Sequence, residues 1–316
     1  MHEDPAMCSP VRFTSQDGHT QIHAHIWQDA SGRRPKAIVQ IVHGMAEHIG
    51  RYDDFARFLV NRGYAVCGHD QLGHGASSRP EDWGVIPADE GKDILIGDIR
   101  TMGELAAEQL GRDLGRFLFG HSMGSYLARA CITRFGTGLQ GAVLSGTGHV
   151  PPVVSRAGHA LAKFVCAKDG QRAKSAFLDS LVMGQYSKQV KDAKTESDWL
   201  SRNEDNVRRY RADERCGFMF SAGGFAMLTG LTAEVCSAAS ARRIPKTLPL
   251  LYVAGAEDPV GSCGKGVRTA SEQARTAGVA DVTVKIYPHM RHEILNETGH
   301  GAVYEDIAAW LDGHTD

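Results

Sequence analysis

Residues 120–124, with the sequence Gly-His-Ser-Met-Gly, place a serine hydroxyl between two glycines. The run before them, residues 115–119, has the pattern of a short buried strand, and residues 126–132 have the pattern of a helix. A serine on a sharp strand-to-helix turn needs glycine on both sides, because a Cβ there would collide with the backbone. The N–H groups at the helix start favour developing negative charge. The stretch therefore predicts a nucleophilic Ser122, although an ordinary strand-to-helix connection uses the same residue types.

A serine alcohol becomes a good nucleophile when a histidine accepts its proton and a carboxylate orients that histidine. Residues 248–255 predict a buried strand that ends just before Asp258. A further predicted strand, residues 282–287, is followed by His292. Parallel sheets carry their chemistry at the carboxyl ends of the strands, in the order serine, acid, histidine. We therefore expect Ser122, Asp258 and His292 to act together.

Neighbouring residues offer alternatives to this assignment. Glu257 is a second acid beside Asp258, and His289 is a second base three residues before His292. Asp258 could also serve only as the N-cap of the next helix. His121 is expected to pack inside the turn, because its side chain should leave the turn in a different direction from that of Ser122.

The oxyanion of a tetrahedral intermediate needs two backbone N–H donors. One follows the nucleophile and is assigned to Met123. The other is assigned to Met45, because residues 36–42 predict a strand that opens into His43-Gly-Met-Ala-Glu-His48. Gly44 lets the backbone turn in towards the serine.

Polar residues follow the oxyanion loop, and two interpretations of them stay open. Glu47 and His48, with Arg51 and Tyr52, either support the loop from behind or form the solvated first turn of a helix. The loop at residues 70–77 is expected to be structural, with substrate contact by His74 as the alternative.

Taken together, the motifs resemble those of α/β-hydrolases of the monoacylglycerol lipase and lysophospholipase group. They lie at residues 43–52, 70–77, 120–124, 258–261 and 292–297. The family usually has glycine where this chain has Ala46. The resemblance implies ester hydrolysis through an acyl-enzyme, with no cofactor and no metal. It implies a monoacylglycerol or similar lipid-type ester as substrate. A lysophospholipase, an amidase or peptidase on the same triad, and a non-catalytic ligand-binding scaffold are the alternatives.

The remaining pattern predicts the fold that must position these residues. Residues 11–15 and 21–27 alternate in polarity and meet at Asp17-Gly18, which is typical of an antiparallel hairpin. His23 and His25 share one strand face, and we expect solvent there, with Ile22, Ala24 and Ile26 turned inward, in preference to a metal site. Strands then alternate with helices at 53–61, 92–110, 264–277 and 300–311. This alternation predicts an α/β fold with a mostly parallel central sheet flanked by helices.

The alternation breaks at residues 150–220, which we expect to form a helical cap (lid) on a catalytic core of 1–149 and 221–316. Val153, Val154, Leu161, Phe164 and Val165 have the spacing of an amphipathic helix. Residues 176–183 and 199–210 continue the segment. The apolar residues fit transient contact with a membrane or lipid aggregate, and they fit core packing equally well.

Bulk composition limits the alternatives. The net charge is −2, with acidic and basic residues interspersed, so no nucleic-acid partner is expected. The first ten residues lack the apolar core of a signal peptide. The seven cysteines are scattered without metal-ligand spacing, and an odd number favours reduced thiols and a cytoplasmic location.

Overall fold

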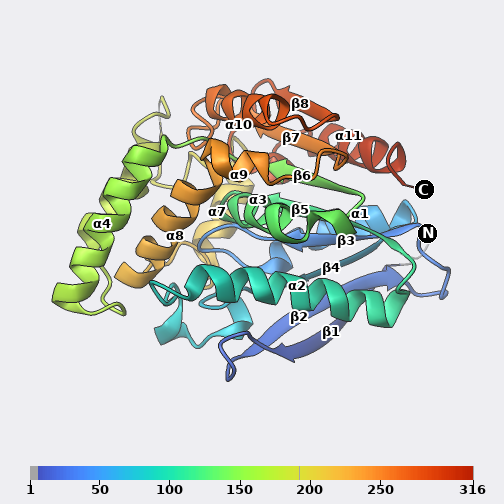
Figure 1. The fold of residues 1–316 in the computed structure, drawn as a ribbon, viewed down its shortest axis with the longest axis horizontal. Helices are drawn as coiled ribbons and strands as arrows, with labels where there is room; N and C mark the ends of the chain where they lie inside the picture. The colour runs from blue at the N-terminus through green and yellow to red at the C-terminus, as the bar shows by residue number, and fades with distance from the viewer. Residues whose placement is uncertain (1–5, 192, 316) are drawn as a thin grey trace.

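The computed structural model describes residues 6–191 and 193–315, which are built around an eight-stranded sheet in the order β1-β2-β4-β3-β5-β6-β7-β8 (Figure 1). The first two strands pair antiparallel with each other, β2 pairs antiparallel with β4, and all other pairs are parallel. The expected α/β-hydrolase class, with its mostly parallel sheet, is therefore confirmed. The strands are β1 (Ala6–Thr14), β2 (Gln21–Asp29), β3 (Ala37–Val42), β4 (Ala65–His69), β5 (Gly115–His121), β6 (Gly141–Ser145), β7 (Leu250–Gly255) and β8 (Val282–Tyr287).

The leading hairpin forms as expected, with Ile22, Ala24 and Ile26 buried on one face of β2. The fold also contains β4, which the sequence pattern did not predict. Its five residues are all buried between β2 and β3, so they show no polar alternation. Buried parallel strands of this length are hard to recognise from periodicity alone.

Helices cover both faces of the sheet (Figure 1). Alternate residues of β5 show the two layers, because Phe117 and Phe119 pack with α1 and α11, whereas Leu118 packs with α2, α3 and α8. Burial of these apolar faces is the main force that holds the layers together. The core helices are α1 (Asp53–Asn61), α2 (Gly91–Leu110), α3 (Met123–Phe135), α8 (Ala222–Val235), α9 (Ala238–Arg242), α10 (Lys265–Thr276) and α11 (His300–Asp312). Short 3₁₀ turns lie at Ile49–Tyr52, Gly75–Ser77, Pro80–Asp82, Gly136–Gly138 and Ile294–Asn296.

The segment between β6 and α8 contains α4 (Pro152–Asp169), α5 (Ala176–Val182), α6 (Gly184–Ser187) and α7 (Glu204–Ala212). The long helix α4 packs along α8, at the edge of the molecule (Figure 1). The packed side of α4 includes Ala162 and Val165, together with polar residues that bond to α8. There Ser155 and Thr232 form a hydrogen bond of 3.1 Å, and His159 Nδ1 donates to the Ala226 carbonyl at 2.8 Å.

The expected helix forms, but its apolar residues do not share one environment. Val165 is buried, but Val153, Val154 and Phe164 are exposed by 71%, 57% and 66%. The close approach to α8 selects small side chains, so the large ones on the opposite side remain in solvent. The third expected piece also differs, because α7 begins only at Glu204, where the Asn203 side chain caps it.

Both ends of the described chain lie against α1 and the residues that follow it. The Ala6 carbonyl accepts a hydrogen bond of 2.9 Å from Arg57, and Thr315 lies 3.3 Å from the Tyr64 hydroxyl. In Figure 1 the two ends are on the side of the molecule away from α4. Within the described residues, no helix combines the length and the apolar character needed to cross a bilayer.

Candidate active site

Ser122 sits on a sharp turn between β5 and α3, with backbone angles φ 53° and ψ −121°. Its N–H donates to the Ser145 carbonyl of β6 at 2.9 Å, which fixes the turn at the carboxyl end of the sheet. Gly124 allows α3 to begin this close to β3, because a Cβ at position 124 would lie 2.1 Å from the Val42 carbonyl oxygen. The serine is thus held in a sparsely populated conformation by the elements on either side.

His292 and Asp258 form a buried pair at the same edge of the sheet. His292 Nδ1 lies 3.0 Å from Asp258 Oδ2, and both side chains are almost fully buried. Asp258 Oδ1 accepts a further hydrogen bond of 2.9 Å from the Val260 N–H. Because Nδ1 donates to the carboxylate, the neutral histidine presents Nε2 as an acceptor. That atom is buried and has no partner among residues 6–191 and 193–315.

The surroundings of His292 set its basicity. Burial alone would lower the pKa of His292, but the charge of Asp258 and the hydrogen bond to it outweigh burial and raise the pKa above its ordinary value. The rings of His121 and Trp199 flank the imidazole, with ring centroids 4.7 Å and 5.1 Å away. Burial, with the nearby His292, lowers the pKa of His121 to about 4. His121 is therefore a neutral packing residue at pH 7.

The alternative acid, Glu257, and the alternative base, His289, lie outside the buried His292–Asp258 pair. Glu257 points to the surface, where it pairs with Arg202 at 2.8 Å. The His289 side chain is 84% exposed and lies 3.6 Å from the same glutamate. Neither is among the described residues that line the cavity with Ser122.

The two backbone donors expected for an oxyanion lie beside Ser122. Met123 is the first residue of α3, so its N–H has no acceptor within the helix. Met45 follows Gly44, where a Cβ would lie 3.0 Å from Ser122 Cβ. Within the described part of the chain, the Met45 N–H donates to no protein acceptor. Both methionines line the cavity that contains Ser122 and His292.

Buried polar side chains support the oxyanion loop. Glu47 accepts hydrogen bonds from the Gly44 N–H, from the Tyr52 hydroxyl at 2.8 Å and from Arg51 at 2.8 Å. His48 Nε2 lies 2.9 Å from Asp213 Oδ2, just after α7. Glu47, His48 and Tyr52 are all buried, so the interpretation as a solvated first turn is wrong for them.

Arg51 connects the oxyanion loop to the histidine loop. Its guanidinium makes two hydrogen bonds of 2.6 and 2.7 Å with Glu293, the residue after His292. Asn206 of α7 donates to the same carboxylate at 2.6 Å. Burial acts to raise the pKa of Glu293, but Arg51 and Asn206 outweigh it and hold the pKa at about 2. Glu293 and Trp199 were not predicted as site residues. Glu293 could have been suspected from its position next to His292, and Trp199 because it is a large aromatic residue in a polar stretch.

The loop at residues 70–77 lies behind the oxyanion loop. Asp70 Oδ1 accepts a hydrogen bond of 2.8 Å from the Ile49 N–H. His74 is fully buried, and burial lowers its pKa to about 3, so it is neutral at pH 7. His74 Nδ1 donates to the Leu72 carbonyl, and Nε2 accepts from the Ala46 N–H at 3.3 Å. His74 therefore supports the loop and does not line the cavity.

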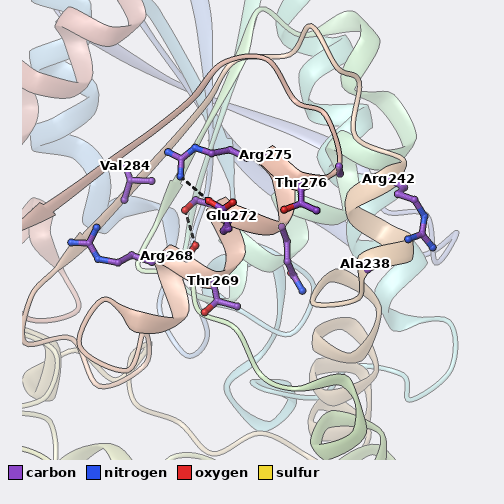
Figure 2. Close-up of a pocket in the computed structure, with 11 residues that line it drawn as sticks. Ala238, Arg242, Arg268, Thr269, Glu272, Arg275, Thr276 and Val284 are labelled. Atoms are coloured by element: carbon purple, nitrogen blue, oxygen red, sulfur yellow. Dashed lines mark hydrogen bonds and ion pairs between the residues drawn. The ribbon is translucent and has the colours of Figure 1, made fainter.

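The cavity at Ser122 holds only about 60 Å³. Its upper part is formed by residues from the segment between β6 and α8, namely Val182, Met183, Tyr186, Trp199, Leu200 and Tyr210. A larger groove of about 870 Å³ lies along α9 and α10, and Figure 2 shows its arginines spread over an open surface, with Arg275 turned to Glu272. Because that groove lacks a nucleophile–histidine pair, the smaller cavity is the candidate site.

One cluster in the described residues has the composition of a metal site. His48, Asp213 and Cys216 bring their ligand atoms within 4.8 Å of one another. Arg215 already occupies Asp213 with hydrogen bonds of 3.0 and 2.9 Å. Burial raises the pKa of the Cys216 thiol to about 12, which disfavours the thiolate that binds metals. The cluster therefore links α7 to the oxyanion loop without favouring an ion.

Comparison with known proteins places the chain in a family. Residues 33–299 match the family described as serine aminopeptidase, S33. The chain is 30% identical to a monoacylglycerol lipase of Mycolicibacterium smegmatis, with 89% of each chain covered. It is 27% identical to the human monoglyceride lipase, with 89% of this chain and 84% of that protein covered. A thermostable carboxyl esterase from Bacillus coagulans has a TM-score of 0.91 at 29% identity, with 98% and 99% covered. The chain therefore belongs to the serine aminopeptidase S33 family of α/β-hydrolases, within the monoacylglycerol lipase group.

Proposed function

We propose that this carboxylic ester hydrolase cleaves monoacylglycerols or similar lipid-type esters through Ser122, His292 and Asp258. The proposal rests on the hydrogen bonding of the two ring nitrogens of His292. Its Nδ1 is held by Asp258, while its buried Nε2 is free of protein partners in a cavity that Ser122 shares. In this structure Nε2 makes no hydrogen bond to the Ser122 hydroxyl. Such contacts often form only in the substrate complex, where this base would accept the serine proton.

The proposed reaction has two halves. Ser122 Oγ attacks the ester carbonyl carbon while His292 Nε2 takes the hydroxyl proton. The Met45 and Met123 N–H groups stabilise the oxyanion that forms, and Asp258 stabilises the imidazolium. When the intermediate collapses, His292 gives its proton to the departing alcohol and leaves an acyl group on Ser122. Water then attacks this acyl-enzyme by the same steps and releases the acid.

We further infer that residues 150–220 act as a lid on the catalytic core formed by 1–149 and 221–316. Support comes from the cavity lining, since Trp199 and Tyr210 of this segment line the same cavity as Ser122. A cavity of about 60 Å³ is too small for a lipid ester, because sites for such ligands usually hold about 300–1,000 Å³. The lid must therefore move before a long acyl chain can enter.

The exposed apolar residues of α4 and α5 support transient contact of this lid with a membrane or lipid aggregate. All seven cysteines are unpaired, which supports the proposed cytoplasmic location.

The test is reaction with a fluorophosphonate probe together with turnover of p-nitrophenyl esters of increasing chain length. Wild-type protein should be labelled at Ser122, whereas Ser122→Ala should lose labelling and at least about 10⁴-fold in kcat. Ser271→Ala, which changes a buried serine of α10, is the matched control and should keep both the labelling and the kcat of the wild type. Wild-type turnover in Ser122→Ala would refute the proposal.

Substrate class is tested with a monoacylglycerol, a lysophospholipid and a paired ester and amide that share an acyl group. Preference for the monoacylglycerol is expected. Faster cleavage of the lysophospholipid or of the amide would favour the corresponding alternative.

A further inference from the structure

We propose that Tyr210 is a positioning residue, which sets the rate of acylation by holding the oxyanion loop through the backbone of Ala46. The inference rests on the proposed function, because it assumes that the Met45 N–H donates to the oxyanion. Tyr210 belongs to α7, so the proposal also makes the lid segment a part of the catalytic geometry.

Ala46 is the residue of the loop that most needs external support. Its φ is 52°, in the left-handed region that is unfavourable for residues with a Cβ. Its carbonyl accepts hydrogen bonds from the Tyr210 hydroxyl at 3.1 Å and from the Gly217 N–H at 2.9 Å. Its N–H donates to His74 Nε2 at 3.3 Å. The two peptide groups on either side of Ala46 are thus held from opposite directions.

The hydrogen bonds of the loop leave the Met45 N–H, the donor that the mechanism needs, between two N–H groups that already have acceptors. The Gly44 N–H is taken by Glu47, and the Ala46 N–H is taken by His74. The Met45 N–H between them is left for substrate, since no acceptor for it occurs within residues 6–191 and 193–315. If Ala46 relaxed towards negative φ, the Met45–Ala46 peptide group would rotate, and through the Met45 backbone this would turn the Met45 N–H away from Ser122. An oxyanion donor acts only when it is aimed at the developing charge beforehand.

Tyr210 is itself held rigidly. Its ring packs under the Arg51 guanidinium, 4.9 Å from the ring centroid, and Arg51 is fixed in turn by Glu47 and Glu293. Just beyond α7, Asp213 pairs with His48 of the same loop at 2.9 Å. Burial raises the pKa of Tyr210, so its hydroxyl remains a donor throughout the working pH range. The segment from Tyr210 to Gly217 therefore holds the oxyanion loop at two points, the Ala46 carbonyl and the His48 side chain.

The test compares Tyr210→Phe with Tyr64→Phe in steady-state kinetics on a short p-nitrophenyl ester and in fluorophosphonate labelling. Tyr64→Phe removes a hydroxyl that bonds to Asp312, at the opposite end of the strands, and is the matched control. Tyr210→Phe should lower kcat and the labelling rate about five- to tenfold, the effect of one lost hydrogen bond. KM and the pH profile should not change, because the His292–Asp258 pair is untouched. Tyr64→Phe should behave as wild type.

A second variant covers the case in which Tyr210→Phe does not fold. Asp213→Ala breaks the clamp at a partly exposed position and should lower kcat about threefold at unchanged KM. Unchanged kcat in both folded variants would overturn the proposal. A rise in KM alone would also overturn it, because it would mean that Tyr210 contacts substrate directly. Wild-type protein that reacts at no serine would instead refute the proposed function.

Discussion

Ser122 and Ala46 both occupy the left-handed backbone region, with φ of 53° and 52°. Each such residue costs about 1–3 kcal/mol, and it persists only where its neighbours hold it. Ser122 lies in the nucleophile turn and lines the cavity, and Ala46 lies in the oxyanion loop between the cavity-lining residues Met45 and Glu47. The strain is thus concentrated where the serine hydroxyl and the Met45 N–H must face one carbonyl group.

Substitutions at Ala46 test how much its positive φ costs in stability. Ala46→Gly removes the Cβ that disfavours φ 52°, so we expect the free energy of unfolding to rise by up to about 1 kcal/mol. Ala46→Val should lower it, because a β-branched residue tolerates this region poorly. Urea denaturation measures both. A loss of stability in Ala46→Gly would contradict the expectation.

The pH dependence should follow His292. Only the neutral imidazole accepts the serine proton, and Asp258 raises the pKa of His292 above the ordinary value of about 6.5. We therefore expect kcat/KM to fall as the pH drops through a value above 6.5. Asp258→Asn removes the negative charge, so the remaining activity should be low and its acid limb should move to lower pH. An acid limb in the same place for both proteins would assign the titration to another group.

At the scale of helices, α4 and α5 present an unusual surface. Their exposed large apolar residues are Val153, Val154, Phe164, Phe177 and Leu181. The helix α4 meets the core mainly through α8, which leaves the opposite side of α4 free. If this segment covers a lipid-ester site, as proposed above, its apolar surface suits contact with the aggregate that supplies the substrate.

The proposed contact of α4 and α5 with lipid is tested with a double variant, Phe164→Ser with Phe177→Ser. Sedimentation with vesicles that contain monoacylglycerol should show weaker binding for this variant than for wild type. Turnover of a short soluble ester should be unchanged, because neither side chain lines the cavity. Met7→Ser, at an exposed apolar residue of β1, is the control. Equal sedimentation of all three proteins would rule out the proposed surface.

For the molecule as a whole, the sequence predicts the sheet apart from β4, most of its covering helices, and the positions of Ser122, Asp258 and His292 in their loops. These follow from local signals, namely periodicity, glycines at turns and loops after buried strands. The link between α7 and the oxyanion loop did not follow from such signals. Tyr210 meets Ala46 across 164 residues of chain, and nothing near either residue indicates the other.

The sequence left open, for a related reason, which apolar residues of α4 are buried. Its spacing of apolar residues gives a helix correctly, but the side that packs is chosen by how closely α8 approaches. Ser155 and Ala162 are buried there, while Phe164 is exposed. Such a choice depends on tertiary packing, which a single sequence does not encode locally.

The placement of both described chain ends against α1 has a practical consequence. They lie on the side of the molecule opposite α4 (Figure 1). A resin, an electrode or a fusion partner attached through either end would therefore stand behind the enzyme. An immobilised preparation made in this way would leave α4, with its exposed apolar residues, turned towards the surrounding solution.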